Sequence, residues 1–185
     1  MSTRSWANPD VHPDGQPTFR DAMARLAGGV AVLTTRDPVG RQCGLTVTAV
    51  ASLSLEPPMV MVGVKKDGFI HDALYVADGW SLTLLAADQV DLAHYAARSR
   101  APGDRDHFGS WPHRPASTGE LVFTGGVAAV ECTSDRFVDA GDHTIAIGTV
   151  VSVAADTTGR TPLIHVDRLY ATPGAALDDH DASLE

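Results

Sequence analysis

Small hydroxyl side chains recur along one face of the segment 44–55. Thr46, Thr48, Ser52 and Ser54 share this face, with Val50 between them. The alternate positions are apolar: Leu45, Val47, Ala49, Ala51, Leu53 and Leu55. Strict alternation predicts one extended strand with a buried apolar face. Hydroxyls on its other face could hydrogen-bond the phosphate or carbonyl oxygens of a ligand, although an ordinary amphipathic strand facing water has the same pattern.

The two lysines of the chain, Lys65 and Lys66, are neighbours at the end of an apolar run, and every other cation is an arginine. In a chain with a net charge of -9, such a pair is a candidate anchor for a phosphate-bearing ligand. The alternative is a pair of solvated lysines that protects a strand end.

An Asp-His pair, Asp142 and His143, follows Gly141 at the start of a predicted strand. An imidazole at this position can hydrogen-bond, titrate or bind a metal. The other histidines show no HxH or HxxxH spacing, so the sequence predicts no metal site. A surface histidine at a strand edge is the alternative interpretation.

Length and composition narrow the class of protein. A chain of 185 residues with 44% hydrophobic and 20% charged residues is expected to form one globular domain. The negative net charge disfavours nucleic-acid binding, and no apolar run is long enough to cross a membrane. Two cysteines without metal-ligand spacing, and no secretory segment after Met1, predict buried free thiols in a cytoplasmic protein.

The elements that must position these residues are mostly strands. Helices are expected at 19–26, 69–77 and 88–98, and strands at 30–35, 44–55, 59–64, 80–85, 126–138, 142–154 and 162–170. Thr18 and Asp21 form a predicted capping box, and residues 99–119 are expected to be an irregular, functional loop. The strands leave no room for helical crossovers throughout, so the prediction is a mainly β, Greek-key antiparallel barrel with a few short helices. A flexible arm is expected at 1–17, the domain at 18–172, and an acidic disordered tail at 173–185.

Taken together, these segments resemble the flavin reductase family, whose members adopt the FMN-binding split barrel. The resemblance is carried by Phe19-Arg20-Asp21-Ala22-Met23, residues 26–35, Gly44-Leu45-Thr46, residues 52–58, Gly141-Asp142-His143-Thr144 and Tyr170. It implies a homodimer that binds FMN or FAD, reduces it with NADH or NADPH, and supplies reduced flavin to a partner monooxygenase.

The resemblance also implies roles for individual residues. His143 would act where the nicotinamide docks, and Lys65, Lys66 and the loop after them would approach the flavin phosphate. The implied flavin-binding residues are Gly44, Leu45, Thr46, Val47, Thr48, Ala49, Ser52, Leu53, Ser54, Lys65, Lys66, Phe69, Asp142, His143 and Tyr170.

The chain departs from the family pattern at two places. Ala49-Val50 stands where a Ser-Phe pair is common, and residues 66–70 replace a Ser-x-Thr phosphate loop with a segment that contains Asp67. A carboxylate repels a phosphate, so two expectations stay open: weak binding of a diffusible flavin, or a phosphate held by the lysines or by an arginine from elsewhere in the chain. A split barrel that binds flavin or haem without turnover is the main alternative. A related oxidase, or a reductase that uses a deazaflavin, is a further one.

Overall fold

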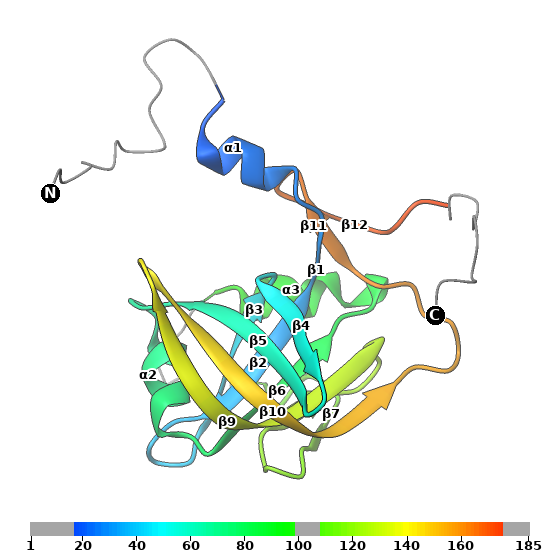
Figure 1. Ribbon diagram of the computed structural model, residues 1–185. Coiled ribbons are helices and arrows are strands. Elements are labelled where there is room, and N and C mark those ends of the chain that lie inside the picture. Colours follow the sequence, from blue (N-terminus) through cyan, green and yellow to red (C-terminus); the bar gives the residue numbers. More distant parts are fainter. Residues whose placement is uncertain (1–16, 99–107, 176–185) are drawn as a thin grey trace, which may run out of the picture.

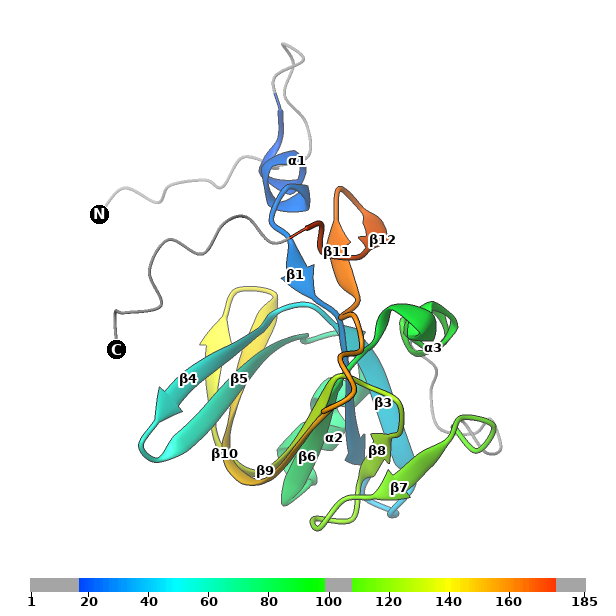
Figure 2. The same ribbon diagram turned by 90° about the vertical axis from the view of Figure 1, so that its right-hand side faces the viewer.

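A seven-stranded antiparallel sheet, curled into a barrel, forms the body of the protein (Figures 1 and 2). The computed structural model describes residues 17–98 and 108–175. The expected arm lies outside these residues except for Pro17, and the expected acidic tail except for 173–175. The strands, in spatial order, are β3 (Gln42–Val47), β2 (Ala31–Arg36), β6 (Gly79–Leu84), β9 (Ala128–Ala140), β10 (His143–Ala155), β5 (Pro58–Lys65) and β4 (Val50–Leu55). All of their pairings are antiparallel, as predicted.

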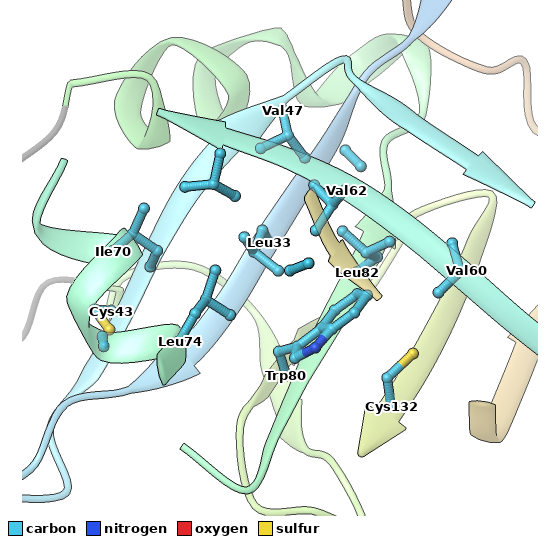
Figure 3. Close-up of a cluster of buried hydrophobic side chains, with 14 residues drawn as sticks. Leu33, Cys43, Val47, Val60, Val62, Ile70, Leu74, Trp80, Leu82 and Cys132 are labelled. Atoms are coloured by element: carbon cyan, nitrogen blue, oxygen red, sulfur yellow. The ribbon is translucent and has the colours of Figure 1, made fainter. Parts of the chain in front are cut away.

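The barrel interior is a close-packed apolar core. Leu33, Trp80 and Leu82 have no exposed surface and lie at its centre (Figure 3). Helix α2 (Phe69–Val76) covers one end of the barrel, and its Leu74 joins this core. Gly148 gives the Trp80 indole its space, because a Cβ there would lie 2.6 Å from the ring.

The segment 44–55 is not the single strand that its alternation predicts. It breaks at Thr48 and Ala49, so that β3 pairs with β2 at one edge of the sheet and β4 pairs with β5 at the other. Leu53 and Leu55, expected on a buried face, are exposed. The alternation of polar and apolar residues continues through the break. The pattern therefore does not show that the strand paired with this segment changes from β2 to β5.

The predicted strand 162–170 is also wrong, because it folds into a hairpin of β11 (Ile164–Val166) and β12 (Leu169–Ala171). Asp167 and Arg168 form its turn with φ values of 52° and 65°. Non-glycine residues rarely adopt these values, and the sequence lacks the Asn-Gly or Asp-Gly signal that marks such turns.

An appended layer projects from the barrel (Figures 1 and 2). It consists of α1 (Phe19–Ala24), β1 (Gly28–Gly29) and the β11–β12 hairpin, with β1 pairing to β11. The capping box of Thr18 and Asp21 is present as predicted. None of the six residues of α1 is buried. The apolar side chains of this helix therefore have no covering partner within the described chain.

The described part of the expected 99–119 loop packs, with β8 (Leu121–Phe123), against the face of the sheet opposite the barrel core, where Phe108 joins Val32 in a second apolar cluster; 99–107 lie outside the described residues. It contains β7 (His113–Pro115), which pairs with β8. The carboxylate of Glu131, buried on β9, accepts hydrogen bonds from the backbone and hydroxyl of Ser117 (2.7 and 2.6 Å) and pairs with Arg114 (2.8 Å). Burial alone would raise the pKa of Glu131, but these partners outweigh burial and hold the pKa below its ordinary value.

The remaining elements follow the predictions closely. The third expected helix is a 3-10 turn, η1 (Ala87–Gln89), followed by α3 (Val90–Ala96). Cys43 and Cys132 are free and buried, as predicted, and burial raises the pKa of each thiol to about 12. Within the described residues, no helix is long and apolar enough to span a membrane.

Candidate functional site

The break between β3 and β4 opens onto a groove of about 610 Å³ beneath α1. This groove, called the α1 groove below, is lined by Arg20, Met23, Ala24, Leu26, Gly28, Thr48, Ala49, His165 and Arg168. Small residues of the β1 and β3–β4 segments line it on the barrel side, while α1 and the β11–β12 hairpin supply the basic side chains. The groove therefore combines space for a flat ring with positive charge.

Glycines allow the backbone to approach closely around this break. The Gly63 amide donates to the Ala49 carbonyl (2.8 Å), and a Cβ at Gly63 would lie only 3.1 Å from the Ala49 Cβ. A Cβ at Gly28 would meet the Thr48 carbonyl oxygen at 3.5 Å. The β3–β4 link is thus fixed against β5 on one side and lies beside β1 on the other.

Ion pairs hold α1 over the groove. The Arg25 guanidinium contacts both carboxylate oxygens of Asp167 at 3.2 Å, and Arg168 pairs with Asp21. The Asp167 amide also donates to the Ala24 carbonyl (2.6 Å). Arg168, and then Thr18, hold the pKa of Asp21 far below its usual range. The two ion pairs Arg25–Asp167 and Arg168–Asp21 are called the clamp below. Because its pKa is lowered, Asp21 stays charged within the clamp at neutral pH and in mild acid.

The predicted Asp-His pair lies at the end of β5 and β10, called the His143 end below. His143 pairs with Lys65 across these strands, and its Nδ1 lies 2.8 Å from a carboxylate oxygen of Asp142. This hydrogen bond from His143 is the main cause that lowers the pKa of Asp142. Gly141 forms the turn before it with a φ of 67°, a value that favours glycine.

The two lysines lie at the His143 end, and both already contact carboxylates. Lys65 Nζ is 2.7 Å from Asp67, while Lys66 pairs with Asp139 and donates to the Gly141 carbonyl (2.7 Å). The structure thus brings the lysine pair and the Asp-His pair together at one end of β5 and β10. It also surrounds the lysines with acidic side chains.

Several expected flavin contacts lie elsewhere or are engaged with the protein. Gly44 packs closely, since a Cβ there would lie 2.9 Å from Phe108, and the Thr46 hydroxyl donates to the Ala93 carbonyl (2.7 Å). Val47 is buried in the core, where Phe69 also packs. Tyr170 contacts the rings of His94 and His165. Leu45, Ser52, Leu53 and Ser54 are outside the lining of the α1 groove, whereas Thr48 and Ala49 are part of it.

Sequence reasoning missed the basic side chains of the groove. Arg20, His165 and Arg168 come from opposite ends of the chain and meet only because β1 pairs with β11. No local spacing links them, although the restriction of the lysines to one pair made the arginines the other candidate anion contacts.

The donor set fits a flavin nucleotide better than a metal. Among residues 17–98 and 108–175, no three His, Cys, Asp or Glu side chains gather where they could hold an ion. Thr48 and Ala49 offer small contacts for a planar ring, and guanidinium groups match phosphate geometry. The turn that connects β9 to β10, at the His143 end, lies on the side of the barrel that faces α1 (Figures 1 and 2).

Comparison with known proteins gives matches over nearly the whole domain. The chain is 35% identical over 170 residues to the NADH:riboflavin 5'-phosphate oxidoreductase of Streptomyces pristinaespiralis, covering 90% of this chain and 92% of the relative. It is 35% identical over 156 residues to the actinorhodin polyketide dimerase of Streptomyces coelicolor, covering 84% and 85%. It is 32% identical to the reductase component of the FADH(2)-dependent resorcinol hydroxylase of a Rhizobium species, covering 90% and 93%.

Solved structures agree with these matches. The NADH:FAD oxidoreductase SgcE6 of Streptomyces globisporus superposes with a TM-score of 0.80 at 26% identity, covering 89% of this chain and 97% of its own. The expected split-barrel fold is therefore confirmed. The model of the flavin reductase like domain matches residues 23–174. The chain belongs to the flavin reductase like domain family.

Proposed function

We propose that this protein is an oxidoreductase that reduces FMN or FAD with NADH. The observation that carries the proposal is the break at Thr48–Ala49, which opens onto the α1 groove in a chain of the flavin reductase like family. Relatives named as NADH-dependent flavin reductases support NADH as the hydride donor in preference to NADPH.

The coenzymes supply the redox chemistry, a hydride transfer from dihydronicotinamide to flavin. The protein has to hold the two rings in contact and exclude water. In the proposal, the backbone and small side chains of Thr48 and Ala49 contact the flavin ring, and the His143 end contacts the nicotinamide. His143 orients the nicotinamide. Its imidazole can also stabilise the negative charge that develops on the flavin ring as the ring accepts the hydride.

We also propose a homodimer, because apolar side chains are exposed on α1 and on the tip of β4. Phe19, Leu26 and Leu55 are 67%, 69% and 87% exposed. Exposed apolar side chains of this size favour an interface, and a second copy could cover both regions. Light scattering after size exclusion measures the mass, and a monomer at micromolar concentration would contradict the proposal.

A partner monooxygenase in the cytoplasm is the proposed recipient of the reduced flavin. One relative is named as the reductase component of a hydroxylase, which supports such a partner. NADH is an intracellular coenzyme, and the two thiols of this chain are free. The relative named as an actinorhodin polyketide dimerase makes polyketides a further class of compound to test as final acceptors.

The first test is NADH and NADPH oxidation at 340 nm with catalytic amounts of protein and FMN, FAD or riboflavin in turn. We expect oxidation that requires both protein and added flavin, with NADH as the better donor. Flavin retained through dialysis without coenzyme oxidation would instead indicate a non-catalytic flavin-binding barrel. A bound chromophore of another kind would indicate a haem carrier.

The role of His143 is tested by His143→Ala, with His113→Ala as a control. His113 is an exposed histidine on β7, away from the α1 groove. We expect His143→Ala to lower kcat by roughly ten- to a hundredfold, as for a lost polar transition-state contact, with little change in flavin affinity. Stopped-flow reduction measures both. A parental rate for His143→Ala would remove this role.

A further inference from the structure

Two basic clusters of the protein differ in their acidic surroundings. At the His143 end, Lys65 and Lys66 face three carboxylates, those of Asp67, Asp139 and Asp142. Around the α1 groove, Arg25 and Arg168 pair one to one with Asp167 and Asp21, and Arg20 and His165 also line the groove. The carboxylates that outnumber the lysines at the His143 end repel a phosphate, whereas no carboxylate is among the described residues that line the α1 groove.

The donors of the two clusters also differ in capacity. A lysine ammonium has three N–H donors, and Lys66 already uses its ammonium for Asp139 and the Gly141 carbonyl. A guanidinium has five donors in a planar fork. Arg168 can therefore keep its contact with Asp21 and still present donors to an anion in the groove.

The position of Arg168 is fixed by the fold. It is the second residue of the β11–β12 turn, with a φ of 65°, and it is half-exposed beside the groove. His165, on β11, lines the same groove and can donate one further N–H. Arg20 belongs to α1 on the opposite wall, and Thr48 offers a hydroxyl on the barrel side. These donors border a volume that is open to a ligand.

We propose that the α1 groove binds the phosphate of the nucleotide substrate through Arg20 and Arg168, and that the lysine pair does not. This assignment rests on the proposed flavin reductase function, and it replaces the lysine anchor that the sequence predicts. It also explains how a chain with Asp67 in its expected phosphate loop could still bind a flavin nucleotide.

The test compares FMN with riboflavin, which lacks the phosphate, in the NADH oxidation assay. Arg20→Gln and Arg168→Gln should each raise the KM for FMN by about tenfold, the loss expected for one charge-assisted hydrogen bond, and leave the KM for riboflavin and kcat unchanged. Lys65→Gln and Lys66→Gln should change the KM for FMN less than about twofold, because screened surface charges contribute little.

Two control variants separate phosphate binding from support of α1. Asp21→Asn breaks the same ion pair as Arg168→Gln but keeps the guanidinium, so it should lower the KM for FMN or leave it unchanged. A rise equal to that of Arg168→Gln would assign Arg168 to the clamp alone and overturn the proposal. Arg160→Gln, at an arginine paired with Asp88 outside the groove, should have no effect.

A second arm identifies which nucleotide supplies the phosphate. The same variants are assayed with NADH and with reduced nicotinamide riboside, which has no phosphate. An effect confined to FMN places the flavin phosphate in the groove, and one confined to NADH places the coenzyme pyrophosphate there. Equal effects on ligands with and without phosphate, or FMN-specific loss only in the lysine variants, would overturn the proposal.

Failure of the proposed function is distinguishable from failure of this assignment. If the parent protein oxidises no coenzyme with any flavin, the function is wrong, yet binding of FMN and riboflavin can still be measured by flavin fluorescence. An FMN preference that Arg20→Gln and Arg168→Gln abolish would then still support the phosphate site. Equal binding of FMN and riboflavin by the parent, together with unchanged NADH binding in the two arginine variants, would contradict it.

Discussion

The barrel and the appended layer are held in place by different interactions. Barrel strands such as β2 and β6 are buried along almost their whole length and meet in an apolar core. Helix α1 buries no residue and is attached by the ion pairs Arg25–Asp167 and Arg168–Asp21. The barrel therefore supplies stability, whereas the layer supplies a wall that a ligand or a second copy can move or cover. The candidate site lies where the two meet.

The largest expected difference comes from the same substitution in both regions. Leu82 has no exposed surface, whereas Leu26 is 69% exposed. Leu82→Ala should lower the free energy of unfolding by about 2–5 kcal/mol, and Leu26→Ala by less than about 0.5 kcal/mol. Urea titration at low protein concentration measures both. Equal losses would show that the layer is as well covered in solution as the barrel core.

Charged groups should show the same contrast. Glu131 is buried and holds Ser117 and the partly exposed Arg114, so Glu131→Ala should cost about 1–3 kcal/mol, the range for hydrogen-bond donors left unpaired. Asp21→Ala removes an exposed partner of Arg168 and should leave global unfolding nearly unchanged while amide exchange in α1 accelerates. Calorimetry and hydrogen exchange check the two outcomes. If Glu131→Ala left the melting temperature at the parental value, the contacts of Glu131 with Ser117 and Arg114 would not stabilise the fold.

Acid should destabilise the barrel and detach α1 only at low pH, when Glu131 and Asp21 become protonated. The folded-state pKa of Glu131 lies below its ordinary 4.5, and that of Asp21 lies well below 3.8. A lowered pKa contributes stability that is complete above the ordinary value and is lost as pH falls through the folded value. Stability and α1 protection should therefore stay level from pH 8 to about 5 and fall below about 4. Circular dichroism and exchange rates measured across this range test the expectation, and a midpoint near pH 6 would contradict it.

The sequence predicts the strands of the barrel well because burial there is repetitive. The apolar run before Lys65 and the apolar residues that recur along β9 and β10 are patterns typical of strands, and they are visible in the sequence. The break at Thr48–Ala49 and the turn at Asp167–Arg168 leave no such sign, since each depends on a partner strand far away in the chain. The β11–β12 turn also places Arg168 at the position where such turns usually have glycine.

Only the part of the candidate site that is formed by neighbouring residues could be predicted from the sequence. Gly141, Asp142 and His143 form a local motif, so the sequence locates the His143 end directly. The α1 groove requires Arg20 and Arg168 to meet, and only the pairing of β1 with β11 brings them together. Sequence reasoning therefore found the lysines, which are neighbours in the chain, and missed the arginines.

The two-residue link between β3 and β4 has a consequence for the order of folding. The hairpins β2–β3 and β4–β5 each form from adjacent segments, whereas β5 must find β10 about eighty residues later. Loop closure of that length is slow compared with hairpin formation. The link at Thr48–Ala49 thus reaches its final shape after both hairpins exist. A nascent or truncated chain that lacks β10 would contain every residue of this link and still lack the pocket, so binding competence would report completion of the barrel.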